Sequence, residues 1–375
     1  MPIKIVPQLL EHEPAVLAFN QRMQDGGSPW GFYSRPDDRW LPRVEGAKTW
    51  REHYLAIEDD EHVRGAYALK PQQWLVGGHM QWICDWQGPF SEGAINPKYA
   101  TLGLRFIRDM LKKYPLLFSV GHGGAQEPMV QLLRSLGWKM HGMPFCIKVA
   151  HPHRFLRRNG YLRRNARNRA ILDCLAWTGL GTVGFPLVQA GIRLLRGGRQ
   201  GDATATVVTE FGDWADEIWS ANQAEYSCIA VRDAAMMNSL IPASGLQNAI
   251  RLRVDLAGSP IGWAVVHHAA PTTDARFGDL AVGLISDCFG SLEHAPRVID
   301  AATRFLASHD VDLIYSNQSH PRWVNAFERT GYMTLANRRL FACSPALSAL
   351  LDPIQDWQRV LHLTNMDGHG PHGFA

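Results

Sequence analysis

Two aspartates occupy the same place in a short sequence pattern that occurs twice. Asp85 lies in Ile83–Gly88 (ICDWQG), and Asp287 lies in Ile285–Gly290 (ISDCFG), 202 residues further along the chain. We expect both near the end of a central strand, where a carboxylate could take a proton from an incoming ammonium group. The alternative interpretation is structural, because an aspartate there can also cap the loop that follows its strand.

A histidine follows a predicted strand in each half of the chain. His122 comes after the strand expected at 116–120, and His320 holds the matching place in the second half. Ligands gather at this edge of open α/β sheets, and imidazole titrates near neutral pH, so both are candidate general bases. Glu127, at the start of the next helix, is a third candidate. A carboxylate there also stabilises a helix N-terminus, and His320 could equally belong to a helix-start turn.

These candidates belong to two halves with the same order of predicted elements. Alternating apolar residues predict the strands, and apolar stripes at helical spacing predict the helices. In the first half we expect strands at 51–57, 63–69, 73–76, 78–85, 116–120 and 145–149, and helices at 99–114 and 128–136. In the second half we expect strands at 207–211, 249–256, 261–267, 280–288, 312–315 and 338–343, and helices at 216–240, 296–308 and 321–330. The repeated order predicts a duplicated domain.

The repeated unit resembles the GNAT acyltransferase superfamily. Gly137-Trp138 and Gly331-Tyr332 are similar to the Gly-aromatic pair that ends the fourth helix of that family. The resemblance implies an α/β (α+β) fold of two GNAT-like domains, each with a mixed, mostly antiparallel central sheet flanked by helices. The domains are expected at 1–150 and 203–350, with a linker at 151–202 and a tail at 351–375.

The stretch Ile95–Leu104 (INPKYATLGL) resembles the loop that cradles the coenzyme A pyrophosphate in this family. Unsatisfied amides at a helix N-terminus bind anions, and small residues let the chain approach closely. The resemblance implies cofactor-binding roles for Lys98, Tyr99, Ala100, Thr101, Leu102, Gly103 and Leu104. Ala100 stands where the family has Arg or Gln, and Arg105 where it has a small residue. The equivalent loop at 290–296 lacks the glycine pattern, so we expect it to bind coenzyme A poorly or not at all.

Positive charge is concentrated between the two halves. Residues 151–200 contain ten arginines and one acid, Asp173, which makes the segment +9 and the remaining chain −6. Between the arginine groups lies the uncharged run 174–188. It is shorter than the about 20 residues of a spanning helix. The interpretations are an anchor on an anionic membrane surface through residues 154–199, or a buried helical hairpin with a solvated basic face.

Composition excludes several classes of protein. The 375 residues are 46% hydrophobic and 19% charged, which is ordinary for a globular chain and not for a disordered or fibrous one. The net charge of +3 gives no nucleic-acid signature, and the six scattered cysteines indicate a reducing compartment. No signal peptide or metal-binding motif is present in this sequence, so we expect no metal. We expect a cytoplasmic protein, peripheral on the inner face of the membrane if the anchor forms.

The resemblance implies an acyl-CoA-dependent N-acyltransferase, using acetyl-CoA or a longer acyl-CoA as co-substrate. The acceptor would be a small-molecule or lipid-linked amine, such as an amino sugar of a surface polysaccharide or its lipid-linked precursor. Two alternatives stay open. One is Fem-like aminoacyl transfer from aminoacyl-tRNA, because Fem-type transferases also have tandem GNAT-like domains. The other is a non-catalytic binding module in which both loops have lost the cofactor.

Overall fold

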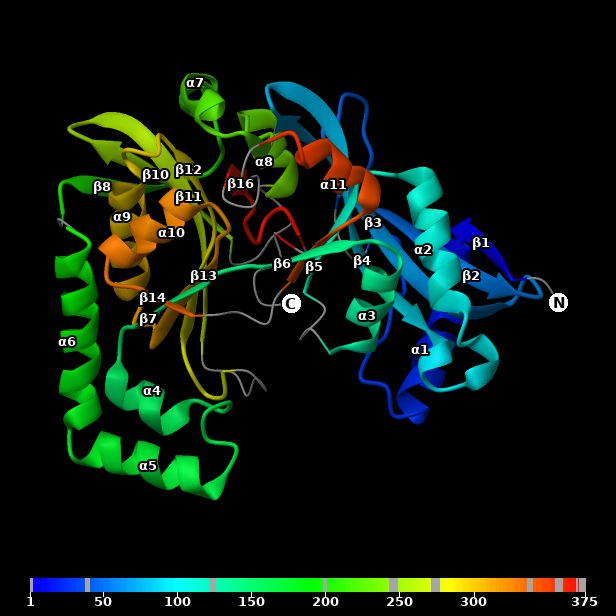
Figure 1. The fold of residues 1–375 in the computed structure, drawn as a ribbon, viewed down its shortest axis with the longest axis horizontal. Helices are drawn as coiled ribbons and strands as arrows, with labels where there is room; N and C mark the ends of the chain where they lie inside the picture. Colours follow the sequence, from blue (N-terminus) through cyan, green and yellow to red (C-terminus); the bar gives the residue numbers. More distant parts are fainter. Residues whose placement is uncertain are drawn as a thin grey trace. The chain divides into compact units, whose positions relative to one another are not determined.

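The computed structural model describes the chain except residues 1–2, 38–40, 122–125, 198–200, 243–248, 271–276, 336–339, 355–359, 369 and 371–375. The chain divides into two compact units, each built around a mixed sheet (Figure 1). Unit 1 comprises Met1–His141 and Leu340–Gln355. Unit 2 comprises Gly142–Arg339 and Asp356–Ala375.

The strands of the unit 1 sheet run in the order β1-β2-β3-β4-β5-β15-β6. Their bounds are β1 (Lys4–Pro7), β2 (Glu52–Glu58), β3 (His62–Val76), β4 (His79–Ser91), β5 (Leu117–Gly121), β15 (Leu340–Cys343) and β6 (Lys139–Gly142). The first four strands pair antiparallel, β5 joins β4 in parallel, and β15 pairs antiparallel with β5. The β4–β5 pair, near the centre of this path, is therefore a parallel step in an otherwise antiparallel run from β1 to β15.

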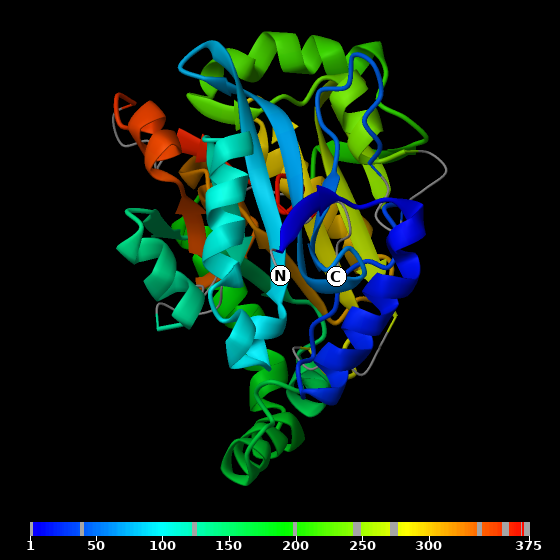
Figure 2. The same cartoon turned by 90° about the vertical axis from the view of Figure 1, so that its right-hand side faces the viewer.

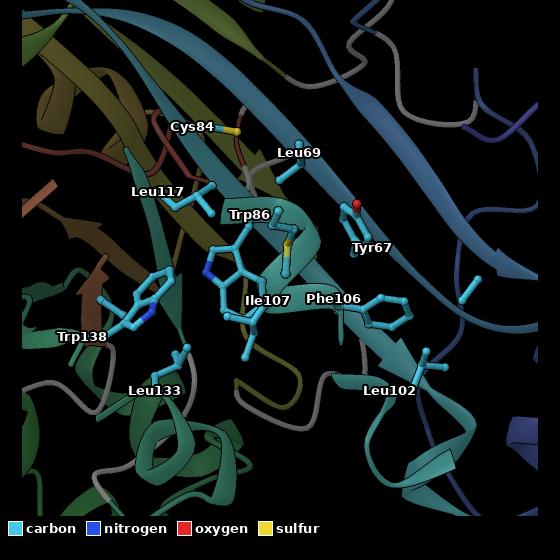
Figure 3. Close-up of a cluster of buried hydrophobic side chains, with 13 residues drawn as sticks. Tyr67, Leu69, Cys84, Trp86, Leu102, Phe106, Ile107, Leu117, Leu133 and Trp138 are labelled. Atoms are coloured by element: carbon cyan, nitrogen blue, oxygen red, sulfur yellow. The ribbon is translucent and has the colours of Figure 1, made fainter. Parts of the chain in front are cut away.

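Helices cover both faces of the unit 1 sheet. Side chains alternate along β3, so that Tyr67 and Leu69 join one apolar cluster while Ala66 and Ala68 join another. The first cluster contains residues of α2 (Leu102–Lys113) and α3 (Pro128–Ser135), as Figure 3 shows. The second contains Val16, Phe19 and Met23 of α1 (Glu13–Asp25). The sheet thus separates α1 from α2 and α3.

The strands of the unit 2 sheet run in the order β14-β7-β13-β12-β11-β10-β8. Their bounds are β14 (Met333–Leu335), β7 (Phe145–Val149), β13 (Leu313–Asn317), β12 (Val282–Gly290), β11 (Ser259–Ala269), β10 (Ile250–Leu256) and β8 (Ala203–Val208). Only the β12–β13 pair of this path is parallel. The unit also contains α7 (Asp213–Asn222), α8 (Ala234–Leu240), α9 (Ala295–Ala307) and α10 (Pro321–Arg329). A parallel step therefore lies at the same place in both sheets.

The closing strands of the two halves are exchanged. We predicted that 145–149 closes the first sheet, but β7 pairs with β13 and β14 in unit 2. We predicted that 338–343 closes the second, but β15 pairs with β5 in unit 1. Both segments are strands as expected, and only the choice of neighbour was wrong. The expected domain limits at 150 and 203–350 therefore differ from the two units that the structure forms.

Other elements differ in their bounds. The segment 63–76 is a single long strand, β3, instead of two. The region 216–240 is not one helix, because the short strand β9 (Cys228–Ala230) separates α7 from α8. Asp233 starts α8 by accepting a hydrogen bond from the Met236 amide at 2.9 Å. The linker is part of unit 2 and forms α4 (Pro152–Arg158), α5 (Ala166–Trp177) and α6 (Leu180–Leu195).

Candidate functional site

The loop between β4 and α2 leaves backbone amides free at the start of the helix. Asn96 accepts from the Lys98 amide at 3.0 Å and so shapes the turn before α2. Thr101 precedes α2 without capping it through its side chain. Among the residues that the structure describes, the amides of Leu102, Gly103 and Leu104 have no hydrogen-bond acceptor. These amides could bind an anion, because they are unpaired and lie at the positive end of the helix dipole.

A surface pocket of about 260 Å³ opens beside this helix start. Its lining residues come from three separate parts of unit 1, and they are Ile3, Glu58, Lys98, Tyr99, Thr101, Leu102 and Arg105. Gly103 has open space where a side chain would begin. The predicted cofactor loop therefore borders a pocket with more positive than negative charge. Nothing in the sequence linked Glu58 to this loop.

Glu58 organises the charges in the pocket. It accepts hydrogen bonds from Tyr99 Oη at 2.7 Å and from Lys98 Nζ at 3.0 Å, and these hold its pKa down to about 2. Tyr99 is buried, so its hydroxyl fixes the loop to β2. Lys98, which we predicted to contact phosphate, is already paired with a carboxylate. Arg105, whose guanidinium donates to the Ile3 carbonyl at 2.6 Å, is the other cation of the pocket.

The two parallel strands of unit 1 separate after a short paired stretch. Within the described residues, β4 and β5 pair only at Cys84 with Leu117 and at Asp85 with Phe118. On the side of α2 and α3, the buried rings of Trp86 and Trp138 lie 5.8 Å apart (Figure 3). The sequence analysis placed Trp138 in the Gly-aromatic pair that follows a helix, but it did not predict that Trp138 packs against Trp86.

Asp85 lies on the other face of the sheet from Trp86. Its carboxylate is buried and accepts a hydrogen bond from Gln87 Nε2 at 2.6 Å. Lys70 on β3, which is fully buried, is its partner in the strand register. The arrangement suits a carboxylate that is held in place inside the sheet. The sequence analysis did not identify Lys70 or Gln87 as partners of Asp85. The position of Lys70 within the apolar run 66–71 could have indicated a buried lysine.

The other two candidates of unit 1 differ in what can be said of them. His122 lies outside the described residues. Glu127 is exposed and precedes α3, but its side chain makes no capping hydrogen bond. Its carbonyl accepts from the Gln131 amide at 3.1 Å, so only its backbone starts the helix. The Glu127 carboxylate is therefore accessible from water.

Asp287 of unit 2 belongs to a buried ion network. Arg232 Nη2 lies 2.9 Å from the Asp287 carboxylate and 2.7 Å from the Asp367 carboxylate, and all three side chains are almost fully enclosed. Thr364 Oγ1 donates to Asp287 at 2.8 Å. Two carboxylates thus share one guanidinium. This arrangement indicates a structural role for Asp287.

The carboxyl-terminal segment 361–368 lies between β12 and β13 beyond the point where these strands pair. The pairing ends at Leu284 with Tyr315. On one side, His362 Nε2 lies 3.2 Å from the Cys288 carbonyl of β12. On the other, the Ser319 amide donates to the Leu363 carbonyl at 3.1 Å, just after β13. The space between the separated strands of unit 2 is therefore filled by the protein's own chain.

His320 is enclosed in the same region. It precedes α10, its ring lies 5.4 Å from the ring of Tyr226, and burial lowers its pKa to about 4. A histidine that is neutral at pH 7 and shielded from solvent has no route to an acceptor amine. His320 therefore belongs to the enclosed interior of unit 2.

The repeated aspartates are not equivalent in the two sheets. Asp85 is itself part of the parallel pairing, whereas Asp287 lies three residues beyond the last paired residue of β12. The pattern of letters therefore repeats with a shift relative to the strand register. Among the described residues, no group of three or more His, Cys, Asp and Glu side chains could hold a metal ion.

Two mixed sheets with flanking helices, each with a parallel step between neighbouring central strands (β4–β5 and β12–β13), define a tandem GNAT-like fold, which confirms the predicted fold class. No family model matches the chain, and no curated protein matches it. Several solved structures match the chain in fold. A probable N-acyltransferase from Enterococcus faecalis is 10% identical with a TM-score of 0.53, over 94% of this chain and 75% of that one.

Two further solved structures share the fold. Saccharomyces cerevisiae N-myristoyltransferase with bound myristoyl-CoA and inhibitors is 9% identical with a TM-score of 0.51, over 92% of this chain and 80% of that one. The GCN5-related glucosamine N-acetyltransferase region of a fungal multi-domain beta-N-acetylglucosaminidase is 14% identical with a TM-score of 0.53. That match covers 91% of this chain and 38% of the other. At these identities the likeness establishes the fold alone.

Proposed function

We propose that this protein is an acyl-CoA-dependent N-acyltransferase whose co-substrate binds to unit 1. The observation that carries the proposal is the start of α2, where three unpaired amides lie beside a pocket lined by two cations and one carboxylate. A diphosphate is a suitable ligand here, because backbone amides and side-chain cations can bind the same anion. The fold supports the proposal, because structures that share it include an enzyme with bound myristoyl-CoA.

Acyl transfer from a thioester to an amine does not require a covalent intermediate with the protein. The acceptor amine, once neutral, attacks the thioester carbonyl, a C–N bond forms, the C–S bond breaks, and the coenzyme A thiol leaves with a proton. Of the predicted residues, Glu127 has the accessible carboxylate that could receive the ammonium proton. Asp85 is better suited to hold the neighbouring strand in place. His122 stays a candidate base.

For the acceptor we propose an amine on a sugar, as a free molecule or as part of a lipid-linked or polysaccharide precursor. The glucosamine N-acetyltransferase region that shares the fold supports this choice. It can be tested by incubating the intact protein with acyl-CoA and a panel of amino sugars, amino acids and polyamines, while released thiol is measured. Turnover with amino acids alone would contradict the sugar acceptor and leave the acyl-CoA proposal standing.

The binding proposal is tested by calorimetric titration of the intact protein with acetyl-CoA, myristoyl-CoA and free coenzyme A. The variant Gly103→Asp places a carboxylate in the open space at the start of α2, where its charge repels a phosphate while favouring the helix itself. Gly103→Asn is the matched control, because it has the same shape without the charge. We expect about a tenfold or greater loss of affinity for Gly103→Asp, or about 1.4 kcal/mol, and a much smaller loss for Gly103→Asn.

Three outcomes would decide against the proposal. Absence of binding by the unaltered protein to every acyl-CoA removes it directly. Unchanged affinity in both Gly103 variants places the phosphate elsewhere. Binding without turnover of any amine would indicate the non-catalytic module instead. Thermal unfolding of both variants verifies that the helix is intact.

A further inference from the structure

The hairpin of α5 and α6 in unit 2 presents an apolar face to solvent. The two helices meet at a sharp corner (Figures 1 and 2). The angle between them is 83°, and Gly179, which lies between them in the sequence, has a φ of +71°, in the left-handed region that suits glycine. One face of α6 is fixed to the unit, because Gln189 Nε2 donates to the Val149 carbonyl at 3.0 Å. A side chain at Gly181 would collide with Leu156. The opposite face of α6 is therefore held outward.

That outward face is apolar along the whole helix. Leu180, Val183, Leu187 and Leu194 follow one another at intervals of three, four and seven residues, which places them on one side of a helix. All four are more than half exposed, and Leu194 reaches 83%. Trp177, at the corner, is also 83% exposed. The outward side of a helix in a globular protein is normally polar, so this stripe lacks a partner in the described structure.

The other helix of the hairpin carries unpaired cations. Arg167 and Arg169, in the first turn of α5, form no ion pair within the described residues. Asp173 is the sole acid from 151 to 200, and Arg163 already binds it at 2.8 Å. The hairpin therefore combines an exposed apolar stripe on α6 with net positive charge on α5. A second copy of the chain would bring the same arginines against these, and like charges repel.

The hairpin suits a position in the plane of a bilayer surface, because its two short helices are bent by 83° relative to each other. Within the part of the chain that the structure describes, no single helix is long and apolar enough to cross a membrane, and only the bent pair α5–α6 passes that test by length and composition. The stripe from Leu180 to Leu194 is about 21 Å long at 1.5 Å per residue. Helices with an apolar side and arginine neighbours lie in the plane of the lipid interface.

We propose that α5 and α6 dock this protein on an anionic lipid surface, with the stripe of α6 at the boundary between headgroups and acyl chains. The arginines of α5 and of the turn before it contact the lipid phosphates. Trp177 sits at the level of the headgroups, as exposed tryptophans do at membrane interfaces. This inference is independent of the proposed enzymatic function, since it involves none of the residues of the α2 pocket.

The test is co-sedimentation of the intact protein with two kinds of vesicle. One is made of phosphatidylcholine alone, and the other also contains roughly 30% phosphatidylglycerol, an anionic lipid of the kind that attracts basic segments. We expect binding to the anionic vesicles that weakens as salt is raised. Leu187→Asp with Leu194→Asp should reduce this binding about tenfold or more. The matched control is Leu17→Asp with Met80→Asp, which changes two apolar side chains of unit 1 that are also more than half exposed and should leave binding unchanged.

Arg167→Glu with Arg169→Glu should remove the preference for anionic vesicles. The proposal is overturned if the unaltered protein sediments with neither vesicle. It is also overturned if analytical ultracentrifugation shows a dimer that Leu187→Asp with Leu194→Asp converts to a monomer, since the stripe would then cover itself. Acyl-CoA affinity of the α6 variant should equal that of the unaltered protein, which separates this result from the test at Gly103.

Discussion

Arg232 shows how a single side chain can stabilise a unit that was assembled from distant parts of the chain. Its guanidinium is enclosed with the carboxylates of Asp287, 55 residues away, and Asp367, 135 residues away. A buried pair of like charges is tolerated only with a cation between them, because desolvation of an unpaired carboxylate is costly. The network therefore ties the carboxyl-terminal segment to β12.

Replacing this arginine should destabilise the protein strongly. We expect Arg232→Met to lower the free energy of unfolding by about 3–5 kcal/mol, because two buried carboxylates lose their partner. Arg297→Met is the matched control, since Arg297 pairs with Asp202 at the surface and such pairs contribute about 1 kcal/mol or less. Urea unfolding at pH 7 measures both. Equal, small losses for the two variants would contradict the structural role of the network.

Sequence reasoning found residues of the two sites but not their partners. Asp287 and His320 were chosen for their types and positions, and both turned out to be enclosed. Arg232, Asp367 and Glu58 could not be found, because their contacts join parts of the chain whose distance in sequence carries no pattern. The α2 loop was predictable, since helix starts and glycines leave local signals. The pairing of Lys98 with Glu58 was not.

At the scale of elements, the exchange of closing strands has a direct physical reason for escaping prediction. Alternation of apolar residues indicates that Phe145–Val149 and Leu340–Cys343 are strands, but it does not indicate which strand lies beside them. Phe341 and Ala342 are buried in unit 1, and Cys146 and Val149 are buried in unit 2. Both sheets offer an apolar edge of the same kind. The order of elements was therefore predictable where the neighbour was not.

The exchange predicts that the first half of the chain does not fold alone. A fragment of residues 1–150 leaves β5 without β15, whose four residue pairs run from Gly121–Leu340 to Phe118–Cys343. We expect this fragment to aggregate or to lack a cooperative thermal transition, because an unpaired apolar strand edge is exposed. Circular dichroism and gel filtration measure this.

The control for this fragment restores the missing strand. Residues 1–141 joined through a flexible Gly/Ser linker to 340–355 contain all of unit 1. We expect this fused chain to be soluble and to unfold cooperatively. If residues 1–150 fold as well as the fused chain, β15 is dispensable and the exchange has little energetic importance.

At the scale of the whole molecule, the two units have the same fold but not the same capacity for a ligand. Unit 1 has free amides and a pocket at the start of α2. In unit 2, the segment 361–368 occupies the space between β12 and β13, with hydrogen bonds to both sides. One unit is thus suited to binding a ligand and the other to supporting the fold.

We therefore expect one molecule of acyl-CoA to bind per chain. Calorimetric titration should give a stoichiometry of one, and Gly103→Asp should weaken the whole of the binding heat and not half of it. Two equivalent sites, or a remaining site of unchanged affinity in the Gly103→Asp variant, would contradict the difference between the units.

The exchanged strand β15 also determines when the unit 1 sheet can be completed during translation. The ribosome completes β5 at Gly121 but does not reach β15 until Leu340. At about 5–20 residues per second, the nascent first half waits roughly 10–45 seconds with an incomplete sheet. During that interval its open strand edge is a natural target for chaperones. Codon choice or translational pausing between these two points should therefore alter the yield of native protein more than the same change made elsewhere.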